Sequence, residues 1–77
     1  MDDQSILHRI QHLVDEEHRL DDQKSRSPED HERHRAIQVE LDQCWDLLRQ
    51  RRARREFGDD PDGAKVRGER TVEGYEQ

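Results

Sequence analysis

The chain has 77 residues, of which 44% are charged and 27% hydrophobic, and its formal net charge is −6. A chain of this length forms one domain at most, and a mean hydropathy of −1.52 excludes a large buried core. No apolar run is long enough to span a bilayer, and the negative charge speaks against non-specific binding of the whole protein to nucleic acid or anionic lipid.

The N-terminal sequence "MDDQSILHRI" lacks the positive flank and the apolar run of a secretory signal. The chain has a single cysteine, Cys44, whereas small secreted domains normally carry paired cysteines. Both features predict a cytoplasmic protein.

The first predicted helix covers about residues 3–24. Its apolar positions recur every three or four residues, which is the narrow seam of a coiled coil, and Asp2 or Asp3 can cap its positive end. The seam consists of Ile6, Ile10, Leu13, Glu17 and Leu20, and Leu7 and Val14 widen it on one side.

The second predicted helix covers about residues 28–56 and has a clear start. Ser27 can be the N-cap and Pro28 the first helical residue, with acidic residues in the first turn, while Gly58 stops the helix. Its seam is His34, Ile37, Leu41, Cys44 and Leu48, with Trp45 and Leu47 on the two shoulders.

A short connection between two long helices makes them antiparallel neighbours. When positions whose numbers sum to 54 are paired, Leu13 meets Leu41, Ile6 meets Leu48, and each other seam position also meets a seam position. The sequence therefore predicts an all-α fold, an antiparallel two-helix hairpin over residues 1–57 that resembles a coiled coil. Residues 58–77, rich in glycine and charge, are expected to form a mobile acidic tail.

A two-helix seam leaves apolar side chains exposed on its shoulders, namely Leu7, Val14, Trp45 and Leu47. A second hairpin would cover them, so we expect a homodimer that forms an antiparallel four-helix bundle. A heterologous protein partner is the other way to bury the same surface.

Five arginines fall within residues 49–55 of an otherwise acidic chain: Arg49, Arg51, Arg52, Arg54 and Arg55. They are candidates for binding a protein partner, and Tyr75 is a further candidate contact in the tail. An arginine-rich helix can also neutralise phosphates, so an alternative is a nucleic-acid- or ribosome-associated protein. The antiparallel register places Arg51 and Arg52 opposite Asp3 and Asp2, which leaves the other three arginines for a partner.

Two groups of polar residues are candidates for metal binding or for fixing the register. His8, His12 and Glu16 share one helical face at a spacing that can hold zinc, and a metal-binding protein is a minor alternative. The register turns this face to solvent, so we expect no metal and no other cofactor. Glu17 and His34 can instead form a half-buried polar pair that fixes the register of the hairpin.

Cys44 lies in the apolar stripe, where a thiol has a raised pKa and is inert, so it is interpreted as a core residue. No phosphate-binding loop, zinc-binding cysteine pair or nucleophile elbow occurs in the sequence. We therefore expect no catalytic residues and no enzymatic activity.

Several segments together resemble one family: "MDDQSIL", "LVDEEH", "LDQCWDLLRQRRARREFGDDPD" and "TVEGY". The chain resembles, over nearly its whole length, short actinobacterial proteins known as a domain of unknown function, number 2630. The likeness is weakest between Gln23 and Arg35. The resemblance implies a small cytoplasmic helical protein and carries over no activity. From the residues, the leading hypothesis is a non-enzymatic interaction or adaptor protein.

Overall fold

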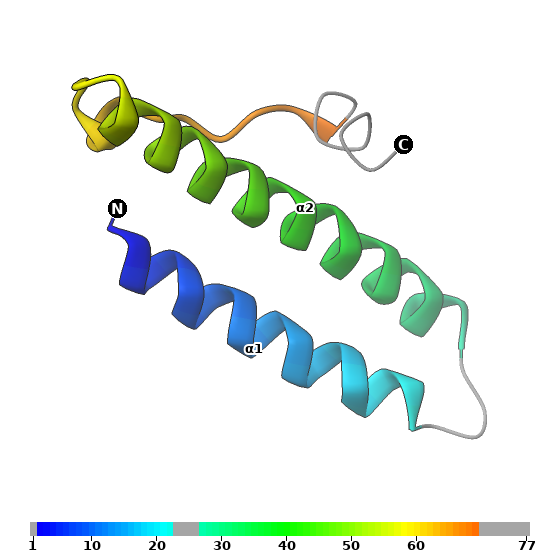
Figure 1. Ribbon diagram of the computed structural model, residues 1–77. Helices are drawn as coiled ribbons and strands as arrows, with labels where there is room; N and C mark the ends of the chain where they lie inside the picture. The colour runs from blue at the N-terminus through cyan, green and yellow to red at the C-terminus, as the bar shows by residue number, and fades with distance from the viewer. Residues whose placement is uncertain (1, 23–26, 70–77) are drawn as a thin grey trace.

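The computed structural model describes residues 2–22 and 27–69. Two long helices, α1 (Asp3–Asp21) and α2 (Pro28–Glu56), lie side by side and antiparallel, and a short 3-10 helix η1 (Pro61–Gly63) follows (Figure 1). The described residues contain no strand, and none of their helices is long and apolar enough to cross a membrane. The prediction of an all-α helical hairpin is therefore confirmed.

Helix α1 begins where the sequence provides a cap. The Asp2 side chain accepts a hydrogen bond from the backbone N–H of Ser5 at 2.8 Å, which satisfies one of the free donors of the first turn. This bond, the largest contribution, lowers the pKa of the Asp2 carboxyl. The helix ends at Asp21, three residues before the predicted end, and residues 23–26 lie outside the described part of the chain.

Helix α2 starts and stops at the predicted residues. The Ser27 side chain accepts from the backbone N–H of Asp30, and the Asp30 side chain accepts from the backbone N–H of Ser27, which together form a capping box ahead of Pro28. After Phe57, Gly58 has a φ of +78°, the left-handed conformation that glycine adopts without a steric cost.

The core lies between the facing stripes of the two helices. In the described residues its buried apolar side chains are Ile6, Ile10, Leu13, Leu20, Ile37 and Leu47. Val14, Leu41, Cys44 and Leu48 are partly buried against them. Most of the predicted seam thus lies inside the hairpin.

The shoulders differ from the prediction in one respect. Leu47 is buried within the single chain, because it packs with Ile6 and Ile10 and lies beside Ala64 from the segment after η1. Leu7 and Trp45 are 49% and 48% exposed. Leu47 therefore needs no second hairpin to cover it, whereas the other shoulder is open.

The segment after α2 folds back instead of extending into solvent. Residues 64–69, which we call the strap, run back along α2 (Figure 1), and Ala64 packs against the core cluster that Ile6 and Leu47 belong to. The Arg51 side chain bonds Asp62 of η1 at 2.9 Å, and Gln50 and Gln43 bond the strap backbone. The mobility of the tail over residues 58–77 stays a prediction, but several of its described residues, among them Asp62, Lys65 and Arg67, contact α2. Residues 70–77, including Tyr75, lie outside the described residues.

Candidate interaction surface

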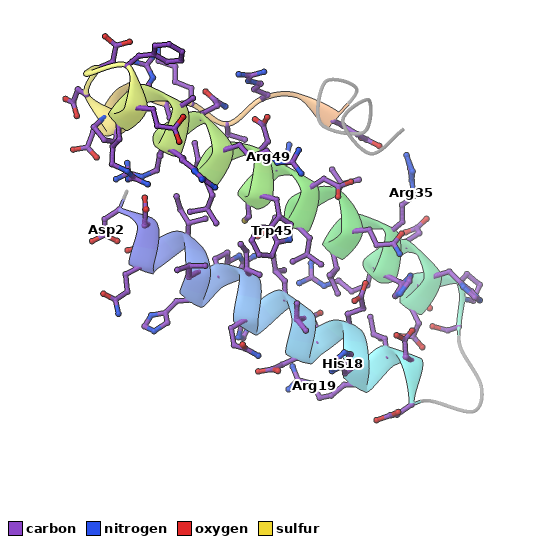
Figure 2. The ribbon with its side chains drawn as sticks, viewed as in Figure 1. Asp2, His18, Arg19, Arg35, Trp45 and Arg49 are labelled. Carbon is purple, nitrogen blue, oxygen red and sulfur yellow. The ribbon has the colours of Figure 1, made fainter. Side chains whose placement is uncertain are left out.

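One side of the hairpin presents an open apolar face made by both helices. It consists of Leu7, Val14, Leu41, Trp45 and Leu48. Leu7 and Val14 are one heptad apart on α1, and Trp45 lies between the other two on α2, so that all five follow the seam between the helices. Figure 2 shows the Trp45 side chain over the gap between the two helices. Half-exposed large side chains of this kind are typical of a surface that another protein covers.

The end of the hairpin near the turn is held by polar side chains. The His34 Nε2 atom lies 3.8 Å from Glu17 Oε2 and 3.5 Å from Asp21 Oδ1, and the side chains of His34 and Glu17 are half-buried. The sequence paired His34 with Glu17 across the seam, and the structure brings them together. It adds Asp21 as a second carboxylate beside the same imidazole.

At the opposite end, Arg51 joins three elements. Its guanidinium is buried and bonds Asp3 of α1 and Asp62 of η1, so that one side chain ties the start of α1, the end of α2 and η1 together. The bonds to Asp62 and Asp3 raise the pKa of Arg51. Arg55 also bonds Asp3, at 2.8 Å, and the guanidinium of Arg55, followed by that of Arg51, holds the pKa of the Asp3 carboxyl below its ordinary value.

The remaining arginines depart from the predicted roles. Arg52 does not face Asp2, because Asp2 is occupied as the N-cap of α1, and it pairs instead with Glu56 one turn further along α2 at 3.2 Å. Arg55, expected to be available to a partner, is bound to Asp3. The Arg54 guanidinium lies against Gly63, and Arg49 also makes an interaction. Carboxylates of the same chain therefore pair with Arg51, Arg52 and Arg55 of the block that is the candidate for phosphate binding.

The candidate metal residues on α1 do not converge. His8 and His12 are exposed, and Arg33 of α2 engages the Glu16 carboxylate with two bonds, of which the one from Nη2 measures 2.7 Å. The bond from Arg33 lowers the pKa of Glu16, which keeps it an anion paired with α2. In the part of the chain that the structure describes, no three His, Cys, Asp or Glu side chains come close enough to hold a metal ion.

Cys44 lies at the floor of a groove between the helices, on the side opposite to the open face. The groove has a volume of about 460 Å³, and Ile6, Leu47 and Val66 supply its apolar walls. An ion pair between Arg9 of α1 and Glu40 of α2 crosses its rim. Burial raises the pKa of the Cys44 thiol, so that it behaves as a small apolar side chain and a poor nucleophile.

The contacts under the strap could not be predicted from the periodicity of the two helices. The Asp46 side chain is 3% exposed because the strap covers it, and it accepts a hydrogen bond from Gln50 at 2.8 Å. Glutamine side chains that bond a backbone leave no mark in the hydrophobic pattern. Only the unusual position of an aspartate directly beside the apolar stripe could have indicated that a covering segment exists.

Comparison with known proteins agrees with the family resemblance. The model of a family described as "Protein of unknown function (DUF2630)" matches residues 2–77. The chain is 48% identical over 77 residues to an uncharacterized protein of Mycobacterium bovis and to uncharacterized proteins of two strains of Mycobacterium tuberculosis. Each match covers 95% of this chain and 88% of the relative. No solved structure matches the chain.

Proposed function

Because the chain belongs to the family described as "Protein of unknown function (DUF2630)", whose description names no activity, we propose a function from its surface. The protein acts by binding rather than by catalysis, as a small helical interaction module that pairs with a second copy of itself through the open face. The observation that carries the proposal is the half-exposure of Leu7 and Trp45 beside a core of few buried side chains.

The second copy is the occupant that best fits the pattern of the face. We place the second copy by a twofold axis that runs parallel to the hairpin, so that α1 of one copy lies beside α2 of the other. Such an axis keeps the axial level found within one chain, where Arg51 of α2 bonds Asp3 of α1. Residues of the two copies whose numbers sum to about 54 therefore lie side by side. Leu7 then comes level with Trp45 and Leu48 of the second copy, and Val14 with its Leu41. All neighbouring helices of the resulting four-helix bundle are antiparallel.

Charge supports the same arrangement. In this register the first turn of α1, which carries Asp3, comes level with Arg52 of the second copy, and Arg52 is largely exposed in the single hairpin. Opposite charges therefore meet at the end of the interface where α1 starts, while apolar side chains meet in its middle. The lone, half-buried Cys44 is consistent with action in a reducing compartment, and we propose the cytoplasm.

Sedimentation velocity of three full-length chains tests this proposal. We expect the wild type to sediment as a dimer at micromolar concentration and Leu7→Glu to sediment as a monomer, because the substitution buries two unpaired carboxylates in the interface. Phe57→Glu is the matched control, since Phe57 is 83% exposed and lies past the end of α2, away from the open face. A wild type that sediments as a monomer, or a Leu7→Glu chain that sediments as a dimer, would refute self-association through this face.

A further inference from the structure

The strap is bound to α2 mainly through its backbone. The side-chain amide of Gln50 makes two bonds to Lys65: its Nε2 donates to the Lys65 carbonyl at 2.6 Å, and its Oε1 accepts from the Lys65 N–H at 3.3 Å. One heptad earlier on α2, Gln43 Nε2 donates to the carbonyl of Arg67 at 3.2 Å. Two glutamines thus hold the backbone of two alternate residues of an extended segment.

A carboxylate between the two glutamines adds the side-chain specificity. Asp46 lies half-way between them on the same side of α2, and its Oδ2 atom lies 3.4 Å from the Nε atom of Arg67. By contrast, Val66 is 63% exposed and Lys65 is also exposed. Gln43, Asp46 and Gln50, which we call the track, therefore recognise an extended backbone and one arginine.

The strap itself is held by contacts that can be exchanged. Its apolar contacts are Ala64, which packs against the core, and the largely exposed Val66 beside the groove, and its other described contacts are polar and at the surface. Such contacts contribute little each, because water replaces them when they break. The bond between Arg51 and Asp62 anchors η1 separately, so the strap can leave the track while η1 stays in place.

We propose that the track is a binding site for an extended, arginine-bearing segment of a partner protein, and that the strap is an intrachain occupant that such a segment displaces. The chain carries a net charge of −6, and the specific contact of the track is a carboxylate, so charge complementarity favours a basic segment. Next to the Arg67 contact, a hollow of about 420 Å³ is lined by Gln43 of the track, by Glu69 of the strap and by residues of α2 that include Glu32, Arg35 and Glu40. A segment longer than the strap could extend into it.

This site goes beyond the proposed self-association, and it does not depend on it. The track lies on the flank of α2 that the strap covers, and its Gln43 also lines the groove that Ile6 and Arg9 of α1 border. The open face, which carries Trp45, is on the other side of the seam between the helices (Figure 2). A dimer formed through the open face would leave the track accessible. A chain that does not dimerise would carry the same track.

The test uses the full-length chain and a synthetic peptide with the sequence of η1 and the strap, PDGAKVRGE. Nuclear magnetic resonance follows the side-chain amide signals of Gln43 and Gln50 as the peptide is added to wild type and to Arg67→Ala. Loss of the Arg67–Asp46 ion pair loosens the intrachain strap, so we expect Arg67→Ala to bind the peptide about fivefold more tightly than wild type. Circular dichroism melting confirms that both chains are folded.

Two controls isolate the arginine contact. A peptide with alanine in place of its arginine, PDGAKVAGE, should bind Arg67→Ala about fivefold more weakly than PDGAKVRGE does. Adding Asp46→Asn to the Arg67→Ala chain should remove the difference between the two peptides, since the carboxamide still accepts the bond from Gln50 but carries no charge. Both effects together support the proposal.

Three results would overturn it. The first is an absence of shifts at Gln43 and Gln50 in Arg67→Ala with millimolar peptide, and the second is equal affinity for the two peptides. The third is a concentration-dependent shift of the Gln50 signal in Leu7→Glu without peptide, which would identify the strap of a second copy as the occupant.

Discussion

Replacement of Leu13 by alanine tests whether the seam between α1 and α2 is the core of the molecule. Leu13 is 0% exposed and lies in a cluster with Leu20 and Ile37, against which Leu41 and Cys44 pack. The substitution removes three carbon atoms from this site, which corresponds to roughly 2.5 kcal/mol of lost burial at about 0.8 kcal/mol per methylene. The cavity that it leaves raises the expected loss in the free energy of unfolding to about 3 kcal/mol.

Leu7→Ala is the matched control, because it makes the same chemical change in the same helix. Leu7 is 49% exposed, so the loss of burial is about half as large and no enclosed cavity forms. We expect a loss of about 1 kcal/mol for the single hairpin. Urea denaturation followed by far-ultraviolet circular dichroism, at a protein concentration low enough to keep the chains monomeric, measures both variants. Equal losses for Leu13→Ala and Leu7→Ala would refute this description of the core.

Three further predictions concern local contacts. Arg33 lowers the folded-state pKa of Glu16, so the pair stabilises the fold fully above the unfolded-state pKa of about 4.5, and this stabilisation is lost as the pH falls below that value. In Arg33→Gln, acid titration followed by circular dichroism should therefore show a smaller loss of stability over this pH range, and a loss equal to that of the wild type would contradict the pairing. Ser27→Ala should reduce the free energy of unfolding by about 1 kcal/mol in urea denaturation, because it removes half of the capping box, and Ser27→Asp should retain most of it. The Cys44 thiol should react with a disulfide reagent more slowly than free cysteine at neutral pH, since burial raises its pKa, and should react at the ordinary rate in urea; a fast reaction of the folded chain would contradict this placement.

The hairpin could be predicted from the sequence because two independent signals agree. The periodicity of the seams places Leu13 opposite Leu41, and the turn signals at Ser27 and Pro28 set the fold-back point. Both signals are local, and the structure confirms the hairpin that they define. The start of α1 at Asp3 and both ends of α2 follow from capping chemistry that is visible in the sequence.

The position of individual side chains around the seam was harder to predict. Trp45 and Leu47 sit on the two shoulders of the same stripe, and a helical wheel assigns them similar burial. They differ because the strap and its Ala64 close one side of the hairpin and leave the other side open. A contact from a segment without periodicity cannot be derived from the pattern of the helices alone.

The arginine block shows the same limitation for charged residues. The register correctly paired Arg51 with Asp3, because both lie at the same level of the hairpin. It did not predict that Arg55 would reach the same aspartate or that Asp62 would bond Arg51, since long side chains and the turn after α2 both extend beyond the seam. The arginine-rich end of α2, which was a candidate for phosphate binding, is therefore a junction at which ion pairs connect α2 to α1 and η1.

The fluorescence of Trp45, the single tryptophan of the chain, tests most directly whether the open face pairs with a second copy. In the lone hairpin this side chain is 48% exposed, so at high dilution its emission should be red-shifted and readily quenched by acrylamide. As the protein concentration rises through the micromolar range, we predict a blue shift and loss of quenching in the wild type and no change in Leu7→Glu. An emission maximum and a quenching constant that stay the same over the whole concentration range would contradict self-association through this face.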